Sequence, residues 1–122
     1  MAAALVPTAA KQTMVNGQLT NTVGLNDATG SLMQQLLDVA ADKTVAIAMG
    51  NPYLGMNFPA VQTYICTYSN TPTSERSAVK LLFGEMQLKG KLPVSLPGIA
   101  ERGFGLELKP EELHAATQNP LR

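Results

Sequence analysis

The chain has 122 residues, and its nine basic and nine acidic side chains cancel to a formal net charge of zero. This length allows one domain at most, and a hydrophobic content of 45% excludes bulk disorder. Because the charges balance and form no run of one sign, no global field favours nucleic acid, anionic lipid or an acidic partner. No stretch approaches the roughly 18 consecutive apolar residues of a membrane-spanning helix.

The first dozen residues show no periodic pattern, and we expect residues 1–12 to form an unpatterned N-terminal arm. Residues 1–6 are apolar, but they include no basic residue and are followed by Pro7, so they make a poor signal peptide. Cys66 is the only cysteine, which excludes an intramolecular disulfide and leaves the redox compartment open. The sequence is therefore compatible with a cytoplasmic chain and equally with a periplasmic or secreted one.

A β-hairpin is indicated over residues 13–20, where Asn16-Gly17 separates two short mixed runs. Asn-Gly between such runs is typical of a type I′ turn. The runs are short and weakly apolar, so a strand that ends in a loop is the alternative. Residues 21–30 are polar and contain glycine, which indicates a loop.

An amphipathic helix is expected from Ser31 to about Asp42. Ser31 would cap it, with Gln34 as the capping-box partner three residues later. Its apolar face is predicted from helical spacing, with Met33 and Leu37 beside the main stripe of Leu32, Leu36, Val39 and Ala40.

Two short apolar runs, residues 45–49 and 63–68, are each stopped by turn residues. Runs of this length indicate strands that are buried on both faces, as in a parallel sheet. The carboxyl ends of such strands are where open α/β sheets usually hold ligands. We therefore predict binding residues directly after the two strands, namely Asn51, Tyr53, Ser69 and Asn70. Structural roles are the alternative for Asn51 and Tyr53: the amide could satisfy loop backbone, and the ring could pack on the core instead of stacking on a sugar.

A second helix is expected after Thr71, a hydroxyl cap followed by proline at the first helical position, and Gly84 is a plausible stop. Residues 90–97 carry two prolines, which indicates an extended segment at a sheet edge or outside the sheet. A short helix is weakly indicated over residues 110–117. This alternation predicts an α/β domain with an open, mostly parallel sheet and flanking helices in a three-layer, sandwich-like arrangement.

Residue types that build active sites are sparse in this chain. His114 is the only histidine, and with Cys66 it cannot supply the four ligands of a structural zinc site. Cys66 lies inside a strand run, where a buried and inert thiol is expected. Glu75, Glu111 and Glu112 each fall in a first helical turn, where a negative charge is favourable. We therefore expect no catalytic residue, no metal site and no cofactor.

Four segments stand in a recognisable order and spacing: Gly50-Asn51-Pro52-Tyr53, residues 64–68, residues 77–85 and residues 90–97. Together they resemble the C-terminal α/β domain of family 3 glycoside hydrolases. The Gly-Asn-Pro-Tyr segment resembles the β-N-acetylhexosaminidase branch more than the β-glucosidase branch. The resemblance covers roughly residues 15–105, so we expect the domain at residues 13–105 and a tail at residues 106–122.

The resemblance implies that catalysis belongs to another part of the parent protein. In that family the nucleophilic aspartate lies in a (β/α)8 barrel that precedes this domain, and in the hexosaminidase branch a His–Asp pair on a barrel loop is the general acid/base. Nothing in this chain matches those segments, and 122 residues cannot also hold a barrel of about 250 residues. The chain is therefore expected to be inactive alone, with the barrel as its partner in a glycosidase of carbohydrate metabolism that acts on β-linked N-acetylglucosamine.

The resemblance also implies that the first strand–helix units of the family's domain would precede Thr13. A truncated sheet would expose a strand edge, so we expect either a homodimer in which two such edges pair or a rearranged N-terminus. The alternative is a free-standing α/β module that binds a small ligand or a carbohydrate at the strand ends.

Overall fold

The structure is a computed structural model that describes residues 1–7 and 9–109. The chain divides into two compact units, unit 1 with residues Met1–Asn70 and unit 2, which begins at Thr71 and is described to residue 109. This division falls inside the domain that we expected over residues 13–105. The tail helix expected over residues 110–117 lies outside the described residues.

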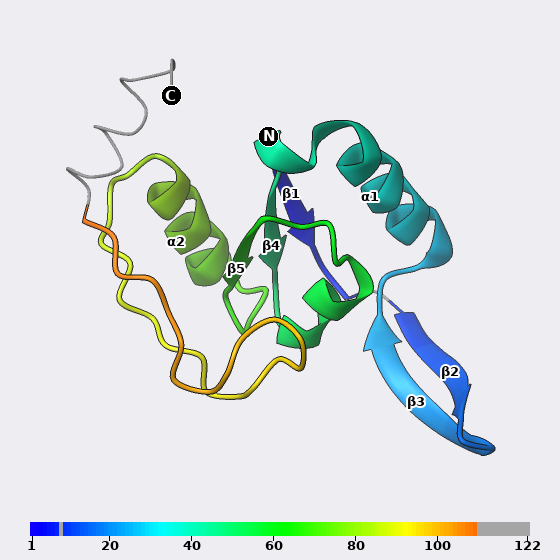
Figure 1. Cartoon of the computed structure of the whole chain (residues 1–122). Helices are drawn as coiled ribbons and strands as arrows, with labels where there is room; N and C mark the ends of the chain where they lie inside the picture. The colour runs from blue at the N-terminus through cyan, green and yellow to red at the C-terminus, as the bar shows by residue number, and fades with distance from the viewer. Residues whose placement is uncertain (8, 110–122) are drawn as a thin grey trace. The chain divides into compact units, whose positions relative to one another are not determined.

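The regular elements follow one another as shown in Figure 1. They are β1 (Ala2–Leu5), β2 (Ala9–Val15), β3 (Gln18–Gly24), α1 (Asp27–Ala40), the 3-10 helix η1 (Ala41–Lys43), β4 (Val45–Ala48), the 3-10 helix η2 (Pro52–Asn57), β5 (Thr63–Cys66) and α2 (Pro72–Leu82).

Unit 1 is built on a three-stranded parallel sheet in the order β1-β4-β5. Val45 in the central strand lies opposite Ala2 on one side and Thr63 on the other, and the register continues unbroken to Ala48. Beyond the strands, the Thr67 N–H donates to the Ala48 carbonyl at 3.0 Å. The parallel pair predicted from the two apolar runs is confirmed, and with the helices it gives the chain an α/β fold. The predicted burial on both faces is wrong for β5, in which Thr63 is exposed and Tyr64, Ile65 and Cys66 are half-buried, because β5 is the last strand in the sheet order.

The strand β1 corrects our expectation of an unpatterned arm over residues 1–12. Its sequence is three alanines and a leucine, which have neither an alternating pattern nor a high strand propensity. Hydrogen bonds to β4 hold it in the sheet: Val45 N–H donates to Met1 C=O at 2.8 Å, and Met49 N–H donates to Leu5 C=O at 3.0 Å. The pairing with a neighbouring strand therefore decides the conformation of this segment.

The hairpin predicted at Asn16-Gly17 is confirmed, and it is longer than expected. Asn16 (φ 52°) and Gly17 (φ 78°) both have the left-handed conformation that a type I′ turn requires. The antiparallel ladder extends over all of β2 and β3, as far as the pair Ala9 and Gly24. The loop predicted over residues 21–30 is therefore wrong, because backbone pairing of a two-stranded ribbon continues through a polar sequence.

The helix α1 begins four residues earlier than predicted. Asn26 is its cap: the Thr29 N–H donates to Asn26 Oδ1 at 2.8 Å, and Asp27 places a negative charge in the first turn. The prediction of Ser31 as the cap is wrong. Gly30 in the first helical turn has low helix propensity, which hid the start of the helix in the sequence.

The buried face of α1 also differs from the predicted stripe. Met33 and Leu37 are buried, whereas Leu32 is 68% exposed and Val39 is 82% exposed. Residues i and i+4 lie above one another on a helix, so the core face is centred on Met33 and Leu37. Leu36 of the predicted stripe also packs against the core, so the predicted and observed faces overlap, and the position of the sheet decides which side of the stripe is buried.

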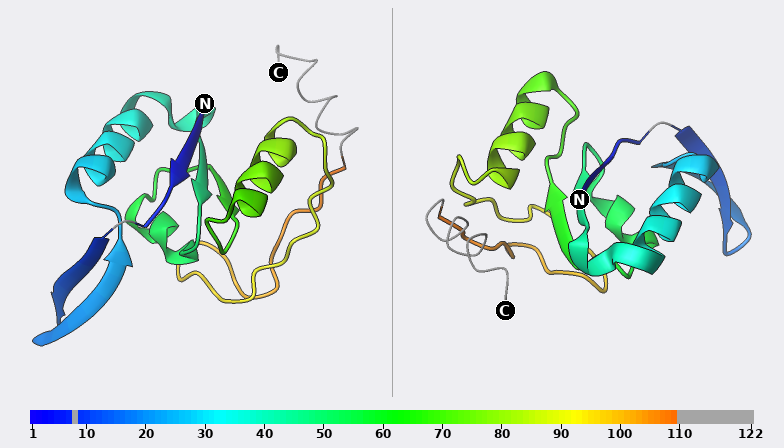
Figure 2. Two further views of the ribbon diagram at one scale, coloured as in Figure 1. Left: turned by 180° about the vertical axis from the view of Figure 1, so that it is seen from behind. Right: turned by 90° about the horizontal axis from the view of Figure 1, so that it is seen from above.

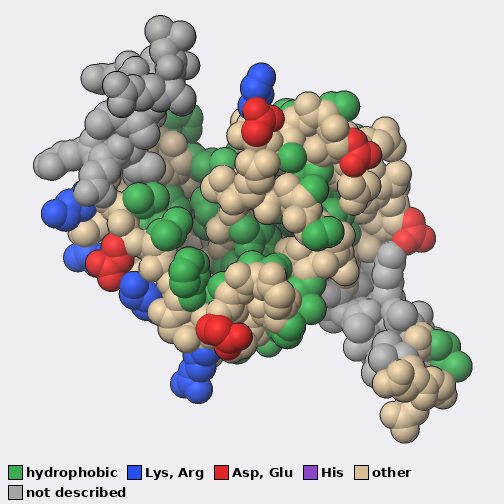
Figure 3. All heavy atoms as spheres, viewed as in Figure 1, with side chains coloured by type: hydrophobic (Ala, Val, Ile, Leu, Met, Phe, Trp, Pro, Cys, Tyr) green, Lys and Arg blue, Asp and Glu red, His purple; other side chains and the backbone are tan. Residues whose placement is uncertain are grey.

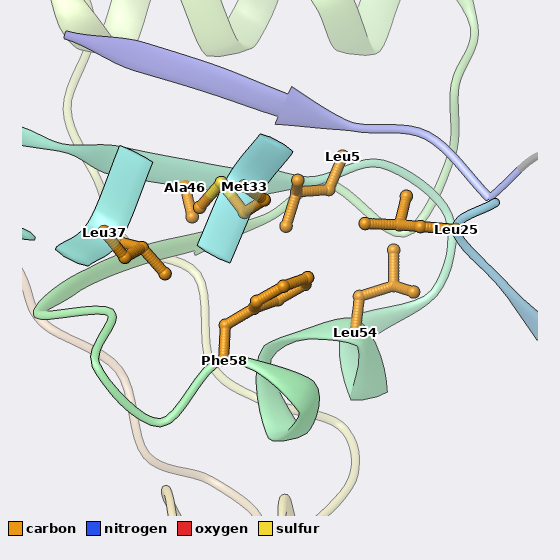
Figure 4. Packing of buried hydrophobic residues seen from close by; sticks show 7 residues of the cluster. All are labelled: Leu5, Leu25, Met33, Leu37, Ala46, Leu54 and Phe58. Atoms are coloured by element: carbon orange, nitrogen blue, oxygen red, sulfur yellow. The ribbon is translucent and has the colours of Figure 1, made fainter. Parts of the chain in front are cut away.

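The core of unit 1 lies between the sheet, α1 and η2, both of which cover the same sheet face (Figure 2). Figure 4 shows the side chains of Leu54 and Phe58 pointing from η2 and its end toward the residues of β1 and α1. The cluster consists of Leu5, Leu25, Met33, Leu37, Ala46, Leu54 and Phe58. The loop that follows β4 is thus anchored in the core.

The helix α2 of unit 2 begins as predicted. Thr71 is the cap, with the Ser74 N–H donating to its Oγ1 at 3.4 Å, and Pro72 occupies the first helical position. Glu75 lies in the first turn. Each of these features could be predicted because a helix start depends on residues close in sequence.

The predicted stop at Gly84 is also confirmed. Gly84 has φ 68°, its N–H donates to Leu81 C=O at 3.0 Å, and the Glu85 N–H donates to Lys80 C=O at 2.8 Å. This pair of bonds is a Schellman motif, which satisfies carbonyls at the end of the helix.

Residues 88–108 of unit 2 double back on themselves outside any regular strand. The Leu88 and Leu108 backbones exchange hydrogen bonds of 3.0 and 3.2 Å, and the Leu92 N–H donates to Phe104 C=O at 2.8 Å. The extended segment predicted over residues 90–97 thus lies outside the three-stranded sheet, as one arm of this irregular hairpin.

Candidate binding site at the strand ends

The candidate site follows from the parallel pairing of β4 and β5. Ala48 lies opposite Cys66, so the segments after these two residues leave the sheet at the same edge. Asn51 and Tyr53 follow β4, and Ser69 and Asn70 follow β5. The fold therefore brings the four predicted binding residues to one end of the sheet.

Asn51 has a structural role at the start of η2. It has the extended backbone expected before proline (φ −110°, ψ 106°), and its Oδ1 accepts the Tyr53 N–H at 3.0 Å. Its side chain is half-buried. The side-chain oxygen of Asn51 therefore satisfies loop backbone, which is the structural role given above as the alternative to ligand binding.

Tyr53 presents its side chain to solvent. It is 44% exposed, as is Met56 three residues later, whereas Leu54 and Gly55 between them are buried. In a 3-10 helix residues i and i+3 lie on the same face. The outer face of η2 therefore carries an exposed aromatic ring and a thioether side by side.

The turn after β5 is held by Thr67. Its Oγ1 donates to the Ser69 C=O at 2.7 Å, while its backbone continues the sheet. Ser69 is half-buried and Asn70 is exposed. Between them and the strand, Tyr68 has φ 58°, a left-handed conformation that is unusual for a residue with a side chain.

Two tyrosines near this end of the sheet were missed in the sequence. Tyr68 is 40% exposed and held in its left-handed turn, whereas the Tyr64 hydroxyl bonds to the backbone of η2. Both tyrosines lie in the second apolar run of the sequence, and this position predicted only that they belong to a strand. A left-handed backbone and a hydrogen bond across the loop leave no signal in the sequence.

Burial raises the pKa values of three groups in and after β5, namely Cys66, Tyr64 and Tyr68. Burial raises the pKa of the Cys66 thiol to about 11, so the thiol is protonated at pH 7. Burial also raises the pKa of Tyr64, and that of Tyr68 is raised by burial and by the nearby Cys66. The site can therefore form hydrogen bonds and stacking contacts, and it offers no activated nucleophile among these three groups.

The described residues contain no group of three or more His, Cys, Asp or Glu side chains that could hold a metal ion. Figure 3 shows acidic and basic side chains scattered among one another on the face it presents, without a patch of one sign. None of the described helices is long and apolar enough to cross a bilayer. His114, Glu111 and Glu112 lie outside the described residues.

This geometry defines a small α/β protein with polar and aromatic side chains at the carboxyl ends of its strands β4 and β5. Comparison with protein-family models, with curated proteins and with solved structures found no match for this chain.

Proposed function

We propose that the chain is the non-catalytic C-terminal domain of a family 3 glycoside hydrolase that resembles the β-N-acetylglucosaminidases. The observation that carries this proposal is the ordered set of four segments, with Gly50-Asn51-Pro52-Tyr53 as the first. In the proposed protein a (β/α)8 barrel supplies the catalytic residues. This chain would be a truncated form of the family's three-layer, sandwich-like domain.

The role of the domain is to support the barrel and to form one wall of the substrate cleft. The α/β fold supports this proposal, because the first two segments fall at the end of β4 and along β5. The chemistry of the strand ends also supports it: an exposed tyrosine and amide groups suit contact with a sugar or a neighbouring domain, not bond cleavage.

A chromogenic N-acetylglucosaminide tests the absence of catalysis. The purified 122-residue chain is expected to release no chromophore above the level of a buffer control. Release that scales with the concentration of the chain and persists through repeated purification would contradict the proposal. The reading frame upstream of Met1 is the complementary test, since a barrel of about 250 residues is expected there.

The second candidate function is a free-standing module that binds a small ligand or a carbohydrate. The observation that favours it is that Tyr53 is 44% exposed and lies at the same end of the sheet as Ser69 and Asn70. Backbone amide shifts during titration with N-acetylglucosamine and with muropeptide fragments separate the two functions. Saturable shifts confined to residues 51–58 and 69–70, and lost in Tyr53→Ala, support the module, whereas no shift supports the accessory domain.

The small sheet also leads us to propose a homodimer, in which an outer strand of one chain pairs with an outer strand of a second copy. The strands β1 and β5 are the two ends of the order β1-β4-β5, and an unpaired strand edge can pair with another chain. Light scattering coupled to size exclusion tests it. A mass of twice 12.9 kDa is expected, and a monomer at every concentration would exclude the dimer.

A further inference from the structure

The Tyr64 hydroxyl joins β5 to the loop that follows β4. It donates a hydrogen bond to Pro52 C=O at 2.8 Å and accepts one from Gly55 N–H at 2.8 Å. Pro52 and Gly55 are residues i and i+3 of η2, the two groups whose direct hydrogen bond defines a 3-10 turn. A phenol can bridge them because its oxygen donates and accepts at the same time.

The ring of Tyr64 fits only because residue 55 is glycine. A Cβ atom at position 55 would lie 2.7 Å from the Tyr64 ring carbon that bears the hydroxyl, and 2.9 Å from its neighbour. Real Cβ atoms do not approach other atoms so closely, so the ring or the loop would have to move. Tyr64 and Gly55 therefore form a matched pair, one filling the space that the other leaves.

The bridged turn fixes the start of η2, and the core fixes its remainder. Leu54 is 1% exposed and Phe58 is 6% exposed, so apolar burial anchors the inner face of the loop. Gly55 has no side chain with which to hold its own conformation. The Asn51 cap holds the Tyr53 N–H from within the loop, and the hydroxyl of Tyr64 adds a restraint on the same turn from β5.

We propose that Tyr64 is a positioning residue that locks the first turn of η2 and thereby fixes the outward direction of Tyr53. Any role of this turn in binding rests on the proposed function. The lock itself does not, because it is defined by contacts within unit 1. A failure of the lock and a failure of the proposed function therefore show in different measurements.

Amide hydrogen exchange in the full chain tests the lock through Tyr64→Phe, which keeps the ring and removes the hydroxyl. Exchange at Gly55 is expected to rise at least about fivefold, since two hydrogen bonds are lost. The sheet amides of Ile47 and Ile65 should exchange as in the unaltered chain. The chain contains two further tyrosines as matched controls. Tyr53→Phe and Tyr68→Phe each remove one hydroxyl and should leave Gly55 exchange unchanged.

Two results would overturn the proposal. Unchanged exchange at Gly55 in Tyr64→Phe would show that the hydroxyl is not the restraint. An equal rise at Gly55 and at the sheet amides would show a general loss of stability instead of a local lock.

A second substitution tests the matched pair. Gly55→Ala alone is expected to raise exchange in the first turn of η2 at least as much as Tyr64→Phe, because the ring is displaced. In a Tyr64→Ala background the same change should have a much smaller effect, since the space is then empty. Effects of Gly55→Ala that are equal in the two backgrounds would contradict the pairing of ring and glycine.

Discussion

Unit 1 and the described part of unit 2 differ in how their apolar side chains are distributed. Unit 1 gathers seven buried residues into one cluster between a sheet and two helical segments. In the described part of unit 2 the buried apolar residues are Ala78 and Leu96, whereas larger side chains such as Phe83 and Phe104 are 69% and 54% exposed. Unit 1 is thus held by packing, and unit 2 shows mainly caps, turns and close backbone contacts.

The two units are therefore expected to respond to different kinds of substitution. Loss of side-chain volume removes contacts and leaves a cavity where packing is dense. Where local backbone geometry holds the chain, loss of a cap or addition of a Cβ atom matters more.

Phe58 and Phe83 give the sharpest contrast, because the same substitution meets opposite surroundings. Phe58 is 6% exposed and belongs to the cluster of unit 1, so Phe58→Ala is expected to lower the free energy of unfolding by about 3–5 kcal/mol. Phe83→Ala is expected to change it by less than about 0.5 kcal/mol, since this ring is 69% exposed. Urea unfolding followed by circular dichroism measures both. Equal losses would show that Phe83 is packed in solution.

Gly105 gives the next largest effect and acts on unit 2. A Cβ atom at this position would overlap the carbonyl oxygen of Gly90, and backbone atoms cannot move aside cheaply. Gly105→Ala is expected to destabilise the irregular hairpin by roughly 1–3 kcal/mol. Faster amide exchange at Leu92 and Phe104 would report it. The matched control is Gly90→Ala, whose Cβ atom would meet nothing within 4 Å and should leave exchange nearly unchanged.

The two helix caps compare the units at a similar motif. Asn26→Ala and Thr71→Ala should each lower the free energy of unfolding by about 1 kcal/mol. The bond to Asn26 is shorter, 2.8 Å against 3.4 Å for Thr71, so the loss at Asn26 should be the larger. Thermal unfolding of the two variants measures the difference, and Thr73→Ala inside the first turn of α2 is the control. A larger loss at Thr71 would reverse this ranking of the caps.

The pH dependence of Cys66 is the smallest effect and belongs to unit 1. Burial raises its pKa from 9.0 to about 11, so between these values the folded chain keeps a proton that the unfolded chain has released. The contribution of this thiol to the free energy of unfolding is therefore fully present below pH 9 and is lost as the pH rises toward 11. Urea unfolding at pH 8 and pH 10.5 should show a steeper decline for the unaltered chain than for Cys66→Ala. Identical declines would show that the thiol ionises as freely when folded.

Prediction from the sequence succeeded where a few neighbouring residues determine the structure. Asn16-Gly17 specified its turn, and Thr71, Pro72 and Gly84 specified both ends of α2. The runs at residues 45–49 and 63–68 specified a parallel pair of strands, and with it the end of the sheet at which the candidate residues lie. Each of these signals is local, because the required backbone angles and hydrogen bonds lie within a few residues.

Features that depend on residues far apart in the sequence were visible only in the folded chain. The strand β1 has no pattern of its own and exists through its ladder with β4. The position of the sheet buried Met33 and Leu37 of α1 and left Leu32 and Val39 of the predicted stripe exposed. The bridge from Tyr64 to Pro52 and Gly55 spans 12 and 9 residues, and it turned a strand tyrosine into the residue that shapes the candidate site. Such contacts join residues that share no local pattern, so the sequence alone carried no sign of them.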